Sequence, residues 1–559
     1  MSTIHGVGVS PGRVVGPVLR MPPPIAPPVP SAPLPAGATA ESESERVRAA
    51  GKAVSAALKQ RAAAASGDAA DVLQATALMA ADPMLLKTAV KLLSTGLHAE
   101  AAVWQAADTV AAQLTALGGY MAERATDVLD VRARIVAELR GVPAPGIPHS
   151  DSPFVLCAED LAPADTATLD PAVVTALVTS GGGPQSHTAI IARALGLPAV
   201  VAARGAAELS EGTVVFVDGA AGVVVPNPGP EEQAAATAYA GRAPLPVFEG
   251  RGETADGHAV PLLANVGGGA DARAAAEAGA EGVGLLRTEF CFLGRDAEPG
   301  HDEQVEAYRA VFEAFPGRKV VVRTLDAGAD KPLPFLTDDA EPNPALGVRG
   351  YRTDSTVPGV LARQLAAIAQ AEAESGADVW TMAPMISTPS EASEFARLCA
   401  EAGLKTAGVM VEVPSAAITA DTVLRDVDFA SIGTNDLTQY AMAADRQLGP
   451  LAVLNDPWQP AVLRLVKATV DGAAEAGGKP VGVCGEAAAD PALAVVLVGL
   501  GVTSLSMTPR ALAAVAAVLR STTLSEAQGL AAAALAADGP AAARDAVRSE
   551  LSVLEDLGV

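Results

Sequence analysis

The sequence predicts a multidomain α/β protein, in which an α/β domain carrying an inserted helical bundle precedes a (β/α)8 barrel. Three observations support this fold class. The chain has 559 residues, which is too long for one hydrophobic core. Strand-like segments lie on both sides of a helical block in its first half. After residue 258, eight apolar strand-like runs alternate with helical segments, as in a parallel barrel.

The N-terminal part of the chain changes character twice. Residues 1–20 resemble short apolar strands broken by Gly and Pro, and the following MPPPIAPPVPSAPLPAG has the proline content of a loop or extended linker. From about Glu41 to Arg140, apolar residues recur at helical spacing, which predicts a small bundle. Strand-like runs such as PFVLCAED and GTVVFVDG then return. We therefore interpret the bundle as an insertion into one α/β domain.

These patterns divide the chain into four parts. The α/β domain should comprise residues 1–34 and 143–227, and the helical insertion should comprise residues 35–142. The stretch PGPEEQAAATAYAGRAPLPVFEGRG predicts a connecting helix and linker over residues 228–250. The barrel should then occupy residues 251–559.

Polar residues fall at the ends of the strand-like runs of the predicted barrel. The runs are VPLLANV, GVGLLRTE, KVVVRTLD, VWTMAPM, AGVMVEV, FASIGTND, PVGVCGE and SLSMT. In a (β/α)8 barrel the functional side chains come from the C-terminal ends of the strands. The residues that should meet at one mouth are Arg287, Arg323 with Asp326, Glu412, Asn435 with Asp436, and Cys484 with Glu486.

The residue types at this mouth suit a small, highly anionic substrate. Guanidinium groups grip phosphate and carboxylate in a bidentate manner, and Lys331 adds a compact positive charge. The arginines are Arg287, Arg323, Arg349 and Arg446. Asn435 can hydrogen-bond a phosphate, the carboxylates of Glu412 and Asp436 suit Mg2+, and Cys484 could donate or accept a proton. Taken singly, each has a common alternative, namely a surface salt bridge, a turn or helix cap, or an inert core cysteine.

Composition excludes several classes of function. A net charge of −25 argues against nucleic-acid binding and leaves solubility alone or a basic protein partner as explanations. The long uncharged stretch 491–509 contains prolines and glycines, which predicts a buried helix, turn and strand rather than membrane insertion. No export leader is recognisable, and the four cysteines show no CxxC spacing. We therefore expect reduced thiols and a cytoplasmic location.

A histidine stands on a glycine-rich turn in GGGPQSHTAIIARALGLPAVV, which begins at Gly181. This pattern places His187 near a helix N-terminus, where backbone N–H groups and the helix dipole favour an anion. The same field disfavours imidazolium and keeps the ring neutral and nucleophilic. A polar helix cap is the alternative for an isolated turn of this kind, but a phosphate-binding barrel nearby favours a phosphoryl acceptor.

Several of these motifs resemble one enzyme family. GVGLLRTEF, MVEVPSA, SIGTNDLTQY and GVCGEAA resemble the phosphoenolpyruvate (PEP)-binding barrel of the PEP-utilising enzymes, and the His187 turn resembles their phosphohistidine segment. The order of the domains resembles that of the Enzyme I group of this family, the phosphoenolpyruvate–protein phosphotransferases of the bacterial sugar phosphotransferase system. The resemblance covers nearly the full chain.

The resemblance implies a role for each candidate. His187 would take the phosphoryl group of PEP in a swivelling α/β domain, Thr166 would orient its ring, and Cys484 would protonate the enolate to give pyruvate. The substrate-binding residues would be Arg287, Arg323, Lys331, Arg349, Asn435 and Arg446. Glu412 and Asp436 would hold Mg2+. The acceptor would be the phosphocarrier protein HPr, docked on the helical insertion, and the barrel would form a homodimer.

Leu78, Met79 and Arg124 match the family's HPr docking surface in position, although helix core or a solvated face explains them equally well. One departure concerns the turn itself, where Pro184 and Gln185 replace the family's usual basic residue and Thr or Ser. That departure supports an alternative, a catalytically impaired paralogue or PEP-sensing binding protein. Pyruvate phosphate dikinase and PEP synthase need a nucleotide-binding domain before the histidine, for which the sequence offers too little length.

Overall fold

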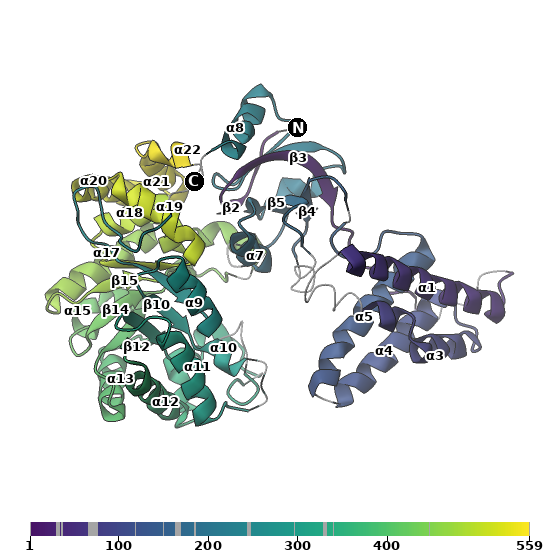
Figure 1. Ribbon diagram of the computed structural model, residues 1–559, viewed down its shortest axis with the longest axis horizontal. Coiled ribbons are helices and arrows are strands. Elements are labelled where there is room, and N and C mark those ends of the chain that lie inside the picture. Colours follow the sequence, from purple (N-terminus) through teal and green to yellow (C-terminus); the bar gives the residue numbers. More distant parts are fainter. Residues whose placement is uncertain are drawn as a thin grey trace.

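The computed structural model describes residues 2–29, 34, 37–64, 76–117, 119–148, 150–161, 169–183, 186–242, 247–293, 295, 297–327, 333–338, 340–446 and 448–557. Figure 1 shows a helical bundle at one end, a sheet domain in the middle and a barrel at the other end. This arrangement confirms the predicted multidomain α/β fold.

One eight-stranded sheet forms the middle of the molecule, in the order β1-β8-β7-β3-β4-β5-β6-β2. The strands are β1 (Ile4–His5), β2 (Val7–Ser10), β3 (Arg13–Arg20), β4 (Phe154–Ala158), β5 (Val174–Thr179), β6 (Ala199–Val201), β7 (Val214–Asp218) and β8 (Val223–Pro226). β3 and β4 pair in parallel, with Val18 opposite Val155, although more than 130 residues separate them in the chain. The strands before and after the helical block thus build one sheet.

The helical block consists of α1 (Ala40–Ala64), α3 (Pro83–Leu93), α4 (Ala99–Leu117) and α5 (Gly119–Arg140). Small alanines let these helices approach closely, and Val103, Val131 and Ile135 fill the space between them. Asp82 caps α3, because its carboxylate accepts hydrogen bonds from the N–H groups of Met84 and Leu85.

All eight predicted runs are strands of a closed parallel barrel. The strands are β9 (Leu262–Val266), β10 (Val283–Arg287), β11 (Lys319–Arg323), β12 (Asp378–Ala383), β13 (Ala407–Val411), β14 (Phe429–Ile432), β15 (Val481–Val483) and β16 (Ser504–Met507). The neighbouring β16 and β9 close the barrel, with Ser506 opposite Leu263. The apolar strands are buried on both faces, inside against one another and outside against the helices.

The surrounding helices follow the strands in order. They are α9 (Gly269–Glu277), α10 (Glu289–Phe292), α11 (His301–Phe312), α12 (Val360–Ser375), α13 (Pro389–Ala402), α14 (Pro414–Ile418), α15 (Ala420–Val423), α16 (Thr434–Met442), α17 (Pro460–Glu475), α18 (Pro491–Gly499) and α19 (Leu512–Arg520). The chain then ends in α20 (Leu524–Ala536), α21 (Pro540–Arg548) and α22 (Val553–Leu557), which pack beside α18 and α19 (Figure 1).

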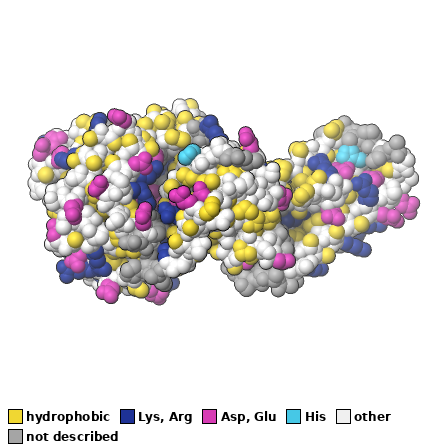
Figure 2. All heavy atoms as spheres, turned by 90° about the horizontal axis from the view of Figure 1, so that it is seen from above, with side chains coloured by type: hydrophobic (Ala, Val, Ile, Leu, Met, Phe, Trp, Pro, Cys, Tyr) yellow, Lys and Arg dark blue, Asp and Glu magenta, His cyan; other side chains and the backbone are white. Residues whose placement is uncertain are grey.

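Two further helices matter for the site. α7 (His187–Leu195) lies between the sheet and the barrel, and α8 (Pro230–Ala240) covers the sheet just before the chain enters the barrel (Figure 1). Figure 2 shows acidic and basic side chains spread over the same face of the molecule, with no large area of one sign. Within the described part of the chain, no helix is both long and apolar enough to cross a membrane.

Candidate active site at the barrel mouth

The predicted polar residues gather at the C-terminal ends of the barrel strands. Arg287 and Arg323 are the last residues of β10 and β11, and Glu412 follows β13 directly. Asp436 stands in the first turn of α16, just after β14, and Cys484 follows β15. The parallel barrel therefore brings side chains from five different strand ends to one mouth.

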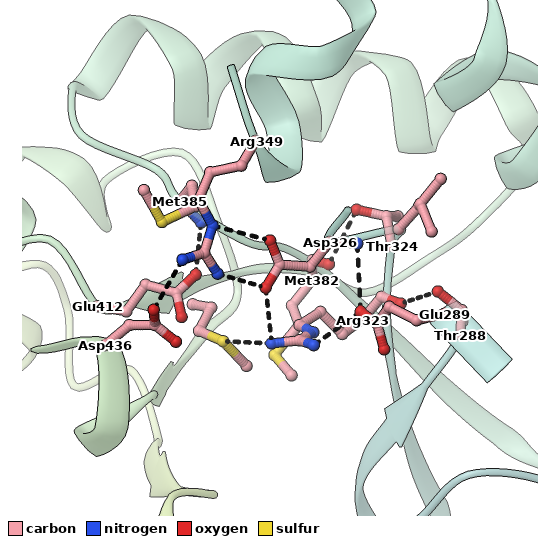
Figure 3. A network of polar contacts seen from close by, with 12 residues as sticks. Thr288, Glu289, Arg323, Thr324, Asp326, Arg349, Met382, Met385, Glu412 and Asp436 are labelled. Carbon is pink, nitrogen blue, oxygen red and sulfur yellow. Dashed lines mark hydrogen bonds and ion pairs between the residues drawn. The ribbon is translucent and has the colours of Figure 1, made fainter. Parts of the chain in front are cut away.

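A chain of alternating charges crosses this mouth (Figure 3). Arg323 Nη2 lies 2.7 Å from Glu289 Oε1, and Arg323 Nη1 lies 3.2 Å from Asp326 Oδ2. Arg349 Nη2 lies 2.9 Å from the same oxygen of Asp326, and its Nη1 lies 2.8 Å from Asp436 Oδ1. The guanidiniums at the end of β11 and in the loop that follows it are thus held side by side by a shared carboxylate.

Arg446 extends this chain of charges, because its Nη1 lies 3.1 Å from Asp436 Oδ2. Both carboxylate oxygens of Asp436 therefore face a guanidinium. Asn435, the neighbour of Asp436, accepts a hydrogen bond of 3.1 Å from the N–H of Glu486. This bond ties the start of α16 to the segment that follows β15.

The ionisation of the two buried acids differs because their neighbours differ. Burial alone would raise the pKa of Asp326, but the guanidiniums of Arg349 and Arg323 outweigh it and lower that pKa to about 2. Burial and the negative charges of Asp436 and Asp326 raise the pKa of Glu412 to about 8. The mouth therefore holds one firmly ionised carboxylate and one that keeps its proton near neutral pH.

Glu412 is where the residues present fit a divalent cation. Its Oε1 accepts a 2.7 Å hydrogen bond from the N–H of Met385, whereas its buried Oε2 has no hydrogen-bond partner among the described residues. A Cβ on Gly433 would lie 2.9 Å from Oε2, so the strand end needs glycine to come this close. An orphaned carboxylate oxygen beside a second carboxylate, Asp436, is the hard-oxygen donor set that Mg2+ prefers.

Cys484 lies inside the barrel end, 3% exposed, with its Sγ 3.6 Å from the carbonyl oxygen of Ile432. Burial raises the pKa of this thiol, although a hydrogen bond with Ser431 and the charges of Arg323 and Arg287 act in the opposite direction. The thiol is therefore protonated at neutral pH and carries a proton that it could give away.

The glycine-rich turn lies against this mouth. Ser186 caps α7 by accepting a 3.3 Å hydrogen bond from the N–H of Ala189, so His187 is the first helical residue, as the sequence predicts. A Cβ on Gly183 would lie 3.1 Å from the carbonyl oxygen of Arg446, which shows how closely the turn approaches the loop after α16.

A second contact fixes the same helix to the barrel. Arg193 Nη1, on α7, lies 3.3 Å from Glu486 Oε2, two residues after Cys484. The helix that begins at the histidine thus touches two of the segments that form the mouth.

Some predicted residues lie outside the described part of the chain: Thr166, Lys331, Pro184, Gln185 and the side chains of His187 and Arg124. On the helical bundle, Leu78 is 61% exposed, whereas Met79 packs partly against the bundle core.

Sequence reasoning missed Glu289 as a site residue. It is 1% exposed, pairs with Arg323 and also accepts a 3.2 Å hydrogen bond from the N–H of Asp326. Its place directly after Arg287-Thr288, at the end of a predicted strand, was the available signal. Its role depends on Arg323 of the neighbouring strand, a pairing that only the barrel reveals.

Three family models match successive parts of the chain. The N-terminal domain of the PEP-utilising enzymes matches residues 5–124, their mobile domain residues 150–222, and their PEP-binding domain residues 248–524.

Curated relatives match over most of their length. A phosphoenolpyruvate-protein phosphotransferase of Streptomyces coelicolor is 54% identical, over 99% of either chain. Proteins of the same name from Haloferax volcanii and Bacillus subtilis are 42% and 39% identical, covering 82% and 79% of this chain and 83% and 80% of their own.

Proposed function

The chain belongs to the PEP-utilising enzyme family, among its phosphoenolpyruvate–protein phosphotransferases, and from that premise we propose how its own residues carry out the reaction. PEP binds at the barrel mouth and gives its phosphoryl group to His187. The observation that carries this proposal is the contact of Gly183 with Arg446, because it sets the start of α7 against the anion-binding mouth.

Substrate binding depends on the network of ion pairs at the mouth. The residues we assign to it are Arg287, Arg323, Lys331, Arg349, Asn435 and Arg446. The ion pairs with Asp326 and Asp436 hold Arg349 in place before the substrate arrives, so little side-chain entropy is lost on binding. The phosphate and the carboxylate of PEP then accept paired hydrogen bonds from the guanidinium N–H groups.

Glu412 and Asp436 are the residues that would hold Mg2+, which when bound neutralises charge on the transferring phosphoryl group. A ring nitrogen of His187 attacks phosphorus while the bond from phosphorus to the enol oxygen breaks. The enolate carbon takes the proton of Cys484, and pyruvate leaves. Thr166 is assigned to orienting the histidine ring.

The second half of the reaction needs a different partner. We propose that the α/β domain of residues 1–34 and 143–227 swings on the linker of 228–250 and presents phosphohistidine to a histidine of HPr. HPr docks on the helical insertion of 35–142, near Leu78, Met79 and Arg124. The barrel of 251–559 forms a homodimer, and the enzyme works in the cytoplasm as the first step of phosphotransferase sugar uptake.

The test is intact mass spectrometry after mixing the protein with PEP and Mg2+. We expect one added acid-labile phosphoryl group and release of pyruvate, both absent in His187→Ala. His258→Ala, which removes an exposed histidine of the barrel, is the matched control and should behave like the natural protein. Adding HPr should then discharge the phosphoryl group. No mass increase despite measurable PEP binding would overturn the proposal.

A further inference from the structure

A cavity of about 320 Å³ lies between the sheet domain and the barrel. On the sheet-domain side its walls come from β2, the end of α7 and the stretch around the end of α8. On the barrel side they come from α16 and the stretch after it, from the segments after β15 and β16, and from α21. Its volume is in the range of small-molecule sites. Asn435 and Arg446 of the mouth line one edge of it, whereas Arg323, Arg349, Glu412 and Cys484 do not, so the cavity adjoins the mouth and extends away from it.

Arginine is enriched in the wall of this cavity, although the whole chain is acidic. Among the described residues, six arginines line it against two carboxylates, whereas the chain has 39 basic and 64 acidic residues. The arginines are Arg193, Arg242, Arg446, Arg510, Arg544 and Arg548. One carboxylate, Asp490, is already engaged by the ring N–H of Trp458 at 2.8 Å, and the other, Glu486, by Arg193. Three of the arginines are themselves paired, Arg193 with Glu486, Arg446 with Asp436 and Arg544 with Asp456, so the positive charge available to an anionic ligand comes from Arg242 and Arg510.

Two of these arginines, one on each side of the cavity, have no carboxylate partner among the residues that the structure describes. The guanidinium of Arg510, on the barrel, makes no hydrogen bond or ion pair with any described residue, and its Nη1 lies 2.9 Å from where a Cβ on Gly196 of the sheet domain would lie. Arg242, after α8, stacks on the ring of Tyr239 at 3.4 Å and donates to its hydroxyl at 2.7 Å. Both bodies therefore present a guanidinium, the group that binds phosphate and carboxylate, to the same cavity.

Part of the remaining wall is apolar. Val7, Val9 and Pro11 contribute from the sheet domain, and Trp458 and Ala514 from the barrel. Removing apolar ligand surface from water at such a wall adds affinity that a bare inorganic anion would not gain. The wall therefore fits a molecule with an apolar body as well as a charged group.

We propose that this interdomain cavity is an effector site for a small organic anion, a phosphate or carboxylate carried on an apolar body. The ligand bridges Arg242 of the sheet domain and Arg510 of the barrel, and so favours the arrangement in which α7 faces the mouth. If the donor domain swings as proposed above, the ligand slows delivery of the phosphoryl group to the acceptor. This consequence rests on the proposed function, whereas ligand binding itself does not.

Calorimetric titration of the full chain in EDTA, without PEP, tests binding separately from turnover. The ligands are phenyl phosphate, benzoate and inorganic phosphate. Saturable binding of phenyl phosphate or benzoate, at least about tenfold tighter than inorganic phosphate, is expected, and the better of the two identifies the charged group.

Two variants locate the site. Arg510→Gln removes an exposed guanidinium and should weaken binding about tenfold. Thr508→Trp, at an exposed position on the cavity wall, should block the space whatever the charge of the ligand. Arg425→Gln, an exposed arginine away from the cavity, is the matched control and should leave binding unchanged.

Three results would overturn the proposal. One is the absence of saturable binding by either organic anion. Another is binding that neither Arg510→Gln nor Thr508→Trp affects, which would place the ligand at the barrel mouth. The third is that inorganic phosphate binds as tightly as phenyl phosphate, which would show that the apolar part of the wall adds no affinity.

Discussion

Arg349 and Asp326 form an ion pair in which both side chains are only 4% exposed and Nη2 lies 2.9 Å from Oδ2. Asp326 Oδ2 is also 3.2 Å from Arg323 Nη1, so one carboxylate bridges two guanidiniums. A pair this buried costs desolvation, and removing one partner leaves the other charge unsatisfied. Asp326 therefore keeps the arginine pair together before substrate arrives.

Asp326→Asn should lower the free energy of unfolding by about 3 kcal/mol at pH 7, because a buried guanidinium pair loses the carboxylate that both members share. The folded pKa of about 2 lies below the ordinary 3.8. The stabilisation is thus present above about pH 4 and is lost as pH falls through 2. The variant should lack this acid-dependent part. Urea unfolding followed by tryptophan fluorescence measures both effects.

Asp471→Asn is the control for that experiment. Asp471 pairs with Lys467 at 2.6 Å on the surface of α17, with more than 40% of either side chain exposed. Its removal should change stability by less than about 1 kcal/mol. Equal effects of the two substitutions would contradict the idea that burial gives Asp326 its importance.

Glu412 should make the metal-free protein less stable as pH rises. Its folded pKa of about 8 exceeds the ordinary 4.5, so the stabilising proton is fully bound below about pH 4.5 and is lost as pH rises through 8. The natural protein in EDTA should lose up to about 1.4 kcal/mol per pH unit within this window. Glu412→Gln keeps the acceptor for Met385 N–H and should show a flatter pH dependence. The measurement is the free energy of unfolding of both proteins in EDTA at pH 6 and pH 9. An equal change between the two pH values in the natural protein and in Glu412→Gln would contradict the assignment.

Cys484→Ser should slow pyruvate formation by about a hundredfold, because a serine hydroxyl is a much weaker acid than the thiol. PEP affinity should stay within about twofold, since Cys484 is not among the residues assigned to phosphate binding. A coupled pyruvate assay in single turnover measures the rate. Cys291→Ser, at a half-buried cysteine on α10, is the control and should leave the rate unchanged. A normal rate in Cys484→Ser would assign proton donation to another group.

Much of the barrel could be predicted because its signals are local. Each strand is a short apolar run with a polar residue at its end, and parallel closure places all such ends together. Arg323, Glu412 and Asp436 were recognisable for that reason. The pairing of Arg323 with Glu289, and of Arg349 with Asp326, joins segments whose side-chain directions sequence spacing does not determine.

Contacts between the domains also could not be predicted from the sequence. Arg193 reads as an ordinary helical arginine near the end of α7, and only docking brings it to Glu486 of the barrel. From the sequence, Gly183 is an ordinary glycine of a flexible turn, whereas in the structure it is where the turn closely approaches the backbone of Arg446. Such contacts depend on the relative placement of two folded bodies, which local periodicity does not encode.

Gly183→Val tests whether this approach serves phosphoryl transfer. A Cβ there would lie 3.1 Å from the carbonyl oxygen of Arg446 and 3.6 Å from Ala452 Cβ, and the branched valine would push the turn from the mouth. We expect phosphohistidine formation to slow at least about tenfold, because misplacement by a fraction of an ångström disturbs in-line transfer. PEP binding and stability should stay unchanged, since the turn belongs to a different folded body. Gly268→Val, where an added Cβ meets no atom within 4 Å, is the matched control. A normal transfer rate in Gly183→Val would mean that the histidine reaches the mouth in another arrangement of the two domains.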